Sequence, residues 1–462
     1  MTEKTPSGSA KLPFALGLGW GIGTINIAIL FNVKNVLLLK FLTDYMGIAI
    51  VLAGSLLGIA KLFDAVTDPL MGMISDRTRS RIGRRRPYLL LGSLMCAASM
   101  LFLFAPPAWA IGSPVYVLFG LLWYSAAYTV FNVPYLAMPA EMTKEYHERS
   151  FLMSFRVAGI SVGQLLAIGF GPVLVSWFGG GLNGHAALAW VLAGLVLAAG
   201  LTSYFSTAKA RFTKREQRRY SLSEQFRAIA QNRPFLLVLG AKFCVLTGTA
   251  FFQSAIAFYM TTNLGLGYSA LGQLVTVMTI FGLLALPIWL KLARRIDKRK
   301  TAALSLFFYA VITASWFFVE NGDPQWMLHA RGVLMGISAS GLTLMLQSLL
   351  PDTIAFDAAR TGENREGIYA GAYTFAEKIA YAIGAAITGI FLGMMGYISG
   401  AAATMAQPES ALFAIALSAS FIPAILFIGS IAFLYWYRLD EKLLATFDNP
   451  TTGSDLKTSG AI

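Results

Sequence analysis

Charged residues, cysteine and histidine are scarce in this sequence. Of its 462 residues, 13% are charged and 56% are hydrophobic, whereas a soluble domain is about 25% charged and about 45–50% apolar. This composition argues against a soluble globular protein. The two cysteines, Cys96 and Cys244, both lie inside apolar stretches, which excludes a disulfide framework. The three histidines show no Cys/His spacing of the kind that binds a transition metal.

Sequence motifs for nucleotide binding and catalysis are also missing. No GxxxxGK[ST] segment occurs, so the sequence offers no phosphate-binding loop for ATP-driven transport. Neither a nucleophile–base set nor a cofactor motif is visible, so we expect no enzyme activity and no cofactor. The polar start, MTEKTPSGSAKLPF, has no short apolar run ending at a small-residue cleavage site, and we therefore expect no removable signal peptide.

Long apolar runs are abundant. Runs of about 17–25 residues predict helices that cross a membrane, and this sequence has twelve candidates. They lie at 14–42, 48–73, 87–106, 113–138, 151–177, 186–207, 234–261, 268–290, 302–319, 326–350, 367–396 and 410–437. The expected fold class is therefore an all-α membrane protein with twelve transmembrane helices.

The basic residues separate by side of the membrane. When alternate loops are assigned to opposite sides, one set holds 29 of the 36 Lys and Arg residues and the other set holds none. The positive-inside rule then places both termini in the cytoplasm, with the chain in a bacterial-type inner membrane. The same distribution accounts for the net charge of +13 as a topology signal rather than as a nucleic-acid-binding surface.

The longest basic loop divides the chain into two halves. We expect an N-terminal six-helix half at 1–207, a cytoplasmic middle loop at 208–233, a C-terminal six-helix half at 234–437 and a cytoplasmic tail at 438–462. A weak internal echo supports a repeat, because a basic loop follows both the second and the eighth span. Major facilitator transporters are built from two such halves.

The second span carries two carboxylates, Asp64 and Asp68. Because they are four residues apart, a helix places both on one face, with Lys61 one turn earlier. An ionisable group at this depth is costly and is a functional-site hypothesis by default. Two neighbouring carboxylates repel each other and need a cation, a proton or a basic partner. With Thr67 they form an oxygen-rich set suited to a small alkali cation, while a structural Lys61–Asp64 ion pair is the alternative.

These acids begin a long motif. It reads Asp64-x3-Asp68-Pro69-x2-Gly72-x3-Asp76-Arg77-Thr78-x-Ser80-x2-Gly83-Arg84-Arg85-Arg86-Pro87. The motif resembles the signature of the glycoside–pentoside–hexuronide:cation symporters, the melibiose-permease family within the major facilitator superfamily. The resemblance extends to both halves through Thr43-Asp44, Asn132-Val-Pro134-Tyr135 and Gly362-Glu-Asn-Arg365-Glu-Gly367.

The resemblance implies a secondary active transporter that carries a sugar-like solute with a cation by alternating access. Asp64 and Asp68 would be the cation-site carboxylates, and Thr129 would add a hydroxyl oxygen. Thr67 stands where the melibiose permease has an asparagine ligand, so Na⁺ and H⁺ both stay open as the coupling ion. Lys378 would be the basic partner that competes with the cation. No other metal is implied.

The substrate stays open because the family's sugar-gripping acids are absent. By the spacing from Thr43-Asp44, one falls at Ala28 and the other at Asn132, so galactoside recognition of that kind is not supported. Arg156 with Lys34 nearby would suit an anionic group such as a hexuronate or sulfonate, although Lys34 could also snorkel or pair with a neighbour. The expected substrate-binding residues are Lys61, Asn132, Arg156, Asn26 and Gln164, and an interhelical hydrogen bond is the alternative role for the three amides.

The basic loop after the second span has a further implied role. Asp76, Arg77, Arg84 and Arg85 would form a cytoplasmic gate through charge pairs with neighbouring helix ends. The implied partners are a small-molecule substrate and the lipid bilayer, with no nucleic acid, and a monomer would suffice. Two alternative functions stay open: cation-coupled transport of an amphiphile such as a lysolipid, and facilitated transport that is not coupled to a cation.

Overall fold

The computed structural model describes residues 13–143, 146–210, 222–363, 365–400 and 406–439. Within these residues, twelve helices are long and apolar enough to cross a membrane, and every regular element is helical. The predicted all-α fold with twelve spans is thereby confirmed. The spans are Phe14–Tyr45, Ile50–Arg77, Arg86–Phe104, Pro114–Pro139, Phe151–Trp177, Gly181–Ser206, Arg233–Asn263, Tyr268–Ile296, Lys298–Phe318, Gln325–Thr361, Glu366–Met394 and Glu409–Trp436.

Three helix boundaries differ from those that the apolar runs predict. Helix α13 (Gln325–Thr361) continues eleven residues beyond the expected end at 350, with Pro351 inside it. The expected loop 291–301 is reduced to a turn at Asp297, between α11 (Tyr268–Ile296) and α12 (Lys298–Ala314). The last span is interrupted at Ser420. Hydropathy marks where a helix leaves the bilayer, not where it ends, since a helix can continue into water.

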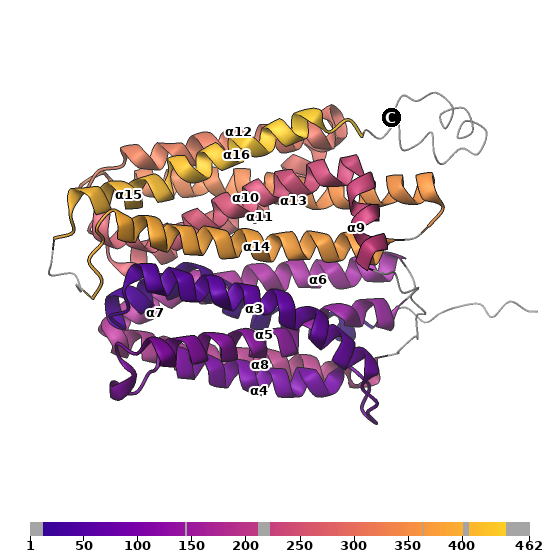
Figure 1. Cartoon of the computed structure of the whole chain (residues 1–462), viewed down its shortest axis with the longest axis horizontal. Helices are drawn as coiled ribbons and strands as arrows, with labels where there is room; N and C mark the ends of the chain where they lie inside the picture. The colour runs from indigo at the N-terminus through magenta and orange to yellow at the C-terminus, as the bar shows by residue number, and fades with distance from the viewer. Residues whose placement is uncertain (1–12, 144–145, 211–221, 364, 401–405, 440–462) are drawn as a thin grey trace, which may run out of the picture. The chain divides into compact units, whose positions relative to one another are not determined.

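The chain packs as two compact units. The first comprises Met1–Val33, Val66–Ala110 and Val115–Gln217. Within it α1 packs against α6 and α8, and α4 packs along α8 (Figure 1). Its helices are α1 (Phe14–Asn32), the later part of α3 (Ile50–Arg77), α4 (Arg86–Phe104), α5 (Pro114–Met142), α6 (Tyr146–Gln164), α7 (Gly171–Trp177) and α8 (Gly181–Ser206).

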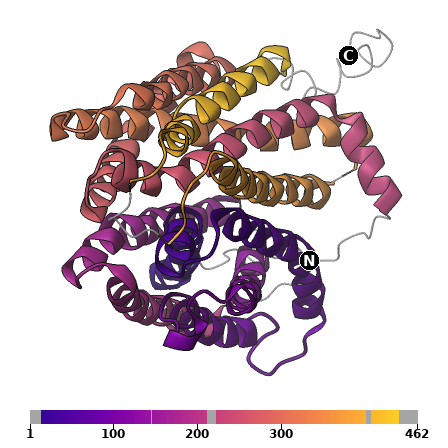
Figure 2. The ribbon, with the colours of Figure 1, turned by 60° about the vertical axis from the view of Figure 1, so that its left-hand side comes forward.

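The second unit comprises Lys34–Ala65, Ile111–Pro114 and Arg218–Ile462. Within it α10 packs against α14 and α16, while α13 packs against α11 and α12, as can be followed in Figure 2. Its helices are the first part of α3, α9 (Leu222–Gln231), α10 (Arg233–Phe258), α11, α12, α13, α14 (Glu366–Met394), α15 (Glu409–Ala419) and α16 (Phe421–Trp436).

The first and seventh spans end in the same way. Each closes in a π-helical turn, η2 (Phe41–Tyr45) and η6 (Tyr259–Asn263), respectively. A glycine with positive φ follows two residues later, Gly47 at 67° and Gly265 at 64°. In both turns a backbone N–H bonds to the carbonyl five residues earlier, at 3.0 and 3.1 Å. This shared ending is a local counterpart of the repeat that the basic loops indicate.

Two glycines bring α3 and α14 into close contact inside the second unit. A Cβ added at Gly389 would lie 2.8 Å from the Cα of Gly54 and 2.8 Å from the carbonyl oxygen of Ile50. Both obstacles are backbone atoms and cannot move aside cheaply. Small residues at such crossings let backbones approach, which is how helices gain van der Waals contact in a membrane.

We therefore expect Gly389→Ala to lower the free energy of unfolding by about 1–3 kcal/mol, because the added methyl group overpacks the crossing. Gly371→Ala is the matched control on the same helix, since no atom lies within 4 Å of its added Cβ. It should be neutral or stabilising by up to about 1 kcal/mol. Unfolding in detergent measures both variants. Equal stability of the two would contradict the role assigned to this crossing.

Candidate functional site

The first unit joins two of the expected cation-site residues. Thr129 on α5 is buried, and its hydroxyl donates a hydrogen bond to Asp68 Oδ1 at 2.6 Å. Asp68 is half-buried on the later part of α3. A carboxylate that accepts from a hydroxyl is held in one orientation, so this pair presents fixed oxygen atoms inside a span.

The second unit surrounds Asp64 with cations. Asp64 is 5% exposed, and Lys34 Nζ lies 3.4 Å from its Oδ2. Lys378 on α14 donates from Nζ to the main-chain oxygen of Asp64 at 3.0 Å. Lys34 sits in the π-helical segment η1 (Val33–Leu37). Asp64 therefore forms an ion pair with Lys34, a partner that the spacing of the second span could not indicate.

A second ion pair lies on α10 and α14, between a Lys242 side chain that is 10% exposed and a Glu377 side chain that is 39% exposed. Lys242 Nζ is 2.9 Å from Glu377 Oε2 and 3.3 Å from the centre of the Tyr373 ring. Lys61 on α3, only 8% exposed, has its Nζ 5.5 Å from the centre of the Tyr381 ring. Aromatic faces stabilise cations that have left water. These contacts explain how lysines are held within the spans.

Together with Lys34, Asp64 and Lys378 these residues form one electrostatic group, the span charge cluster, in which Glu377 and Lys378 are only partly buried: Lys34, Lys61, Asp64, Lys242, Glu377 and Lys378. The charges of Lys34, Asp64, Lys378 and Glu377 all act on Lys61. With four lysines and two carboxylates, the cluster carries a formal charge of +2. Sequence reasoning missed Glu377, and its only signal was an acid directly before Lys378 in a span.

Of the expected substrate-binding residues, Lys61 lies in the second unit and the other four lie in the first. Asn26 Nδ2 on α1 donates to the Val196 carbonyl at 3.1 Å, which is an interhelical hydrogen bond. Asn132 is a buried residue of α5. Arg156 and Gln164 are half-buried on α6. The Nε of Arg156 is buried and bonds to no other residue that the structure describes.

The basic loop forms a charge network at the helix ends of the first unit. Arg84 and Arg85 both donate to Glu141 Oε1 at the end of α5, at 2.7 Å from Arg84 Nη2 and 2.8 Å from Arg85 Nε. Arg85 also pairs with Asp76. The hydrogen bond to Glu141 raises the pKa of Arg84. Arg77, the fourth residue of the expected cytoplasmic gate, is exposed at the end of α3.

The second unit has a similar pair between the start of α12 and the later part of α13. Lys298 Nζ contacts both carboxylate oxygens of Asp352, at 3.1 and 2.8 Å. Asp352 follows Pro351 in α13, much as Glu141 follows Pro139 in α5. The acids that close these two networks, Glu141 and Asp352, were not among the predicted site residues, because each lies far along the chain from its cation.

The two carboxylates around Arg85 differ in burial, so they should differ in effect. Arg85 and Glu141 side chains are each 6% exposed, whereas Asp76 is 56% exposed. Glu141→Gln leaves a buried guanidinium without its main counter-charge, and we expect a loss of about 3–5 kcal/mol. Asp76→Asn should cost at most about 1 kcal/mol. Unfolding in detergent measures both, and an equal or reversed order would contradict this reading of the network.

Twelve apolar helices with charged side chains held inside several of them define a multi-pass membrane protein of the transporter class. Comparison with known proteins narrows this further. The chain matches the model of the MFS/sugar transport protein family over residues 19–441, and it belongs to that family. The predicted family resemblance is confirmed, as are transport rather than enzyme activity and the major facilitator fold.

Similar proteins cover nearly the whole chain. A putative glycoside/cation symporter, YagG of Escherichia coli, is 27% identical over 92% of this chain and 92% of its own. The isoprimeverose transporter of Lactiplantibacillus pentosus is 24% identical, covering 95% and 92%. A putative sulfoquinovose importer of Salmonella typhimurium is 26% identical, covering 94% and 92%.

A solved structure supports the fold. The bacterial homologue of the human lysosomal transporter Spinster superposes with a TM-score of 0.66, covering 92% of this chain and 95% of that one. Its sequence identity is 14%. The likeness therefore concerns the arrangement of the chain and not the solute.

Proposed function

We propose that this protein is a secondary active transporter that carries a sugar-like solute together with a cation across a bacterial inner membrane. Its membership of the MFS/sugar transport family and its symporter relatives support this function. Both termini would lie in the cytoplasm, two six-helix halves would alternate access, and a monomer would suffice. The observation that carries the coupling is the pair of acids one helical turn apart on α3.

Asp64, Thr67, Asp68 and Thr129 are the proposed ligands of the coupling ion. The Thr129–Asp68 hydrogen bond fixes one carboxylate, and the other is held close to a lysine. A bound cation or proton would neutralise the acids, and Lys34 would then be released from its ion pair. Lys378 already donates a hydrogen bond to the main-chain oxygen of Asp64. When the cation leaves, the positive charge of Lys378 would compensate the negative charge of the Asp64 carboxylate.

The proposed solute class is an acidic sugar derivative, such as a hexuronide or a sulfonated sugar. The span charge cluster has two more lysines than carboxylates, and an uncompensated charge inside a span is costly. An anionic solute, arriving as the cation neutralises Asp64, would balance these lysines. The named relatives include both an isoprimeverose transporter and a putative sulfoquinovose importer, so the charge of the solute is the property to test.

We expect Asp64→Asn and Asp68→Asn to abolish uphill accumulation of the solute in proteoliposomes while exchange of labelled for unlabelled solute continues. Coupling free energies correspond to factors of about 5–150, so accumulation should fall by roughly tenfold or more. The control is Asp323→Asn, which changes an exposed carboxylate before α13 and should leave accumulation unchanged. Uphill accumulation at the parent level in both α3 variants would disprove the coupling role.

The same preparation distinguishes the coupling ion. A Na⁺ gradient and a H⁺ gradient are imposed in separate experiments, and in each experiment the other ion is kept at equal concentration on both sides of the membrane. The gradient that drives accumulation in the parent and fails in Asp68→Asn identifies the ion that the acid pair binds. Accumulation with every cation gradient collapsed would indicate a non-coupled facilitator instead.

The charge of the solute can be tested by charge balance within the cluster. Lys242→Gln leaves Glu377 in place and so lowers the formal charge of the cluster from +2 to +1. It should weaken competition by an acidic sugar, relative to its neutral analogue, by roughly tenfold. The double variant Lys242→Gln/Glu377→Gln keeps the charge of +2 and should restore the preference. Competition for uptake by matched acidic and neutral sugars measures both. A parent that prefers the neutral sugar would overturn the acidic assignment without affecting the symport mechanism.

A further inference from the structure

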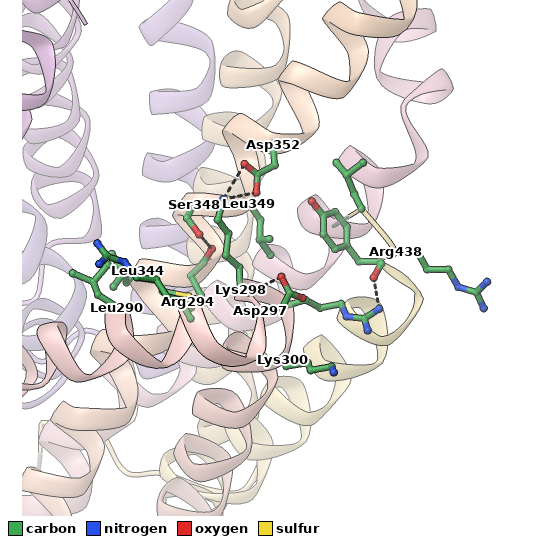
Figure 3. A pocket seen from close by; sticks show the side chains of 15 residues that line it. Leu290, Arg294, Asp297, Lys298, Lys300, Leu344, Ser348, Leu349, Asp352 and Arg438 are labelled. Carbon is green, nitrogen blue, oxygen red and sulfur yellow. Dashed lines mark hydrogen bonds and ion pairs between the residues drawn. The ribbon is translucent and has the colours of Figure 1, made fainter. Parts of the chain in front are cut away.

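The second unit contains a cavity that the transport function does not use. It has a volume of about 1040 Å³ and lies between the end of α11, the start of α12, the later part of α13 and the end of α16. Figure 3 shows Lys298 and Asp352 meeting within it, while Leu290 and Leu344 line one side. The cavity belongs to the end of the spans at which the basic loop residues gather, which the positive-inside rule assigns to the cytoplasm.

Cations dominate the lining of this cavity. Five basic and two acidic residues line it, giving a formal charge of +3. Asp352 is already engaged by Lys298, and Asp297 Oδ1 accepts from the backbone N–H of Lys298. The side chains of Arg294 and Lys300, by contrast, make no ion pair or hydrogen bond with any other residue the structure describes. The lining therefore carries an excess of positive charge that would attract an anion.

The start of α12 strengthens this reading. Three consecutive cations, Lys298, Arg299 and Lys300, occupy its first turn. The positive end of the helix dipole lies there, so this turn favours acidic residues or a bound anion and disfavours cations. The preceding Asp297 has a φ of 86°, the one positive value outside glycine in the described part of the chain. An anion in the cavity would relieve the accumulated positive charge.

A buried hydroxyl also lines the cavity. Tyr437, at the end of α16, is fully buried, and its hydroxyl has no hydrogen-bond partner among the residues that the structure describes. Its carbonyl oxygen accepts from Arg299 Nη1 at 2.7 Å. A buried hydroxyl without a partner costs free energy, and a ligand oxygen in the cavity would provide that partner.

The apolar side of the cavity continues onto a lipid-facing surface. Leu283 of α11 is 41% exposed, and Leu290, seven residues later on the same face of the helix, is 46% exposed and lines the cavity. In a membrane, such exposed side chains contact acyl chains. A ligand that reaches this cavity therefore meets cations beside an apolar surface, which suits an anion that carries hydrocarbon tails.

We propose that this cavity binds the phosphodiester headgroup of an anionic phospholipid, with its acyl chains along α11. Basic pockets between transmembrane helices on the cytoplasmic side suit such headgroups. Arg294 and Lys300 contribute the charge, and the Tyr437 hydroxyl donates a hydrogen bond to a phosphate oxygen. The cavity shares no residue with the span charge cluster, so we assign it to a lipid and not to the solute.

Native mass spectrometry of the purified full-length protein with added phosphatidylglycerol tests this proposal. The variant Arg294→Gln/Lys300→Gln should bind the lipid roughly 25-fold more weakly, at about fivefold for each cation removed. The matched control is Lys291→Gln/Arg295→Gln, which removes the same charge from exposed residues of α11 outside the lining. It should change binding less than about twofold. Equal losses in the two double variants, or no loss in the first, would overturn the proposal.

Two further measurements separate the lipid from other ligands. Inorganic phosphate and glycerol phosphate, each added in place of the lipid, should not raise the unfolding temperature as phosphatidylglycerol does. Equal protection by free phosphate would overturn the lipid assignment. Tyr437→Phe should weaken lipid binding severalfold without lowering the stability of the lipid-free protein, because it removes only an unpartnered hydroxyl. Unchanged binding in this variant would overturn the role of Tyr437.

Discussion

The pairing of charges inside apolar helices is the constraint on which the rest of this structure depends. An ion in a low-dielectric layer must find a counter-charge, a hydrogen bond or an aromatic face. Asp64 with Lys34, and Lys242 with Glu377, satisfy this requirement within the second unit. Each pair joins segments far apart in sequence, so changing one ion affects how those segments pack. A bound cation can exploit the same dependence, because neutralising a carboxylate alters what its lysine contacts.

The charge networks at the helix ends also pair acids with bases, but some of their side chains are open to water, where an unpaired charge costs less. Arg85 and Glu141 are buried together, while Asp76 remains open to water. Lys298 and Asp352 form the corresponding pair in the second unit, but there the surrounding cations exceed the acids. This difference separates a closed network from a site with room for an external anion. Similar basic loops in the two units therefore support different roles.

The sequence was sufficient for the twelve spans and for the acid pair, because hydropathy and the spacing of residues along one helix are local properties. It was insufficient for partners across helices. Lys34 and Asp64 lie 30 residues apart, and Arg84 and Glu141 lie 57 apart, so no periodicity links them. Helix ends were also misjudged at α13, where polar residues continue the helix beyond the apolar run. The residues that bind the solute stay predictions for the same reason, since they depend on packing between elements.

Reciprocal linkage is the most direct test of the central claim that one ion site and one solute site share a free energy. The dissociation constant of the solute is measured with and without the coupling cation, and that of the cation with and without the solute, by calorimetry on the purified protein. The account predicts that each ligand tightens the other by the same factor, between about 5 and 150. Unchanged affinities on both sides would contradict it.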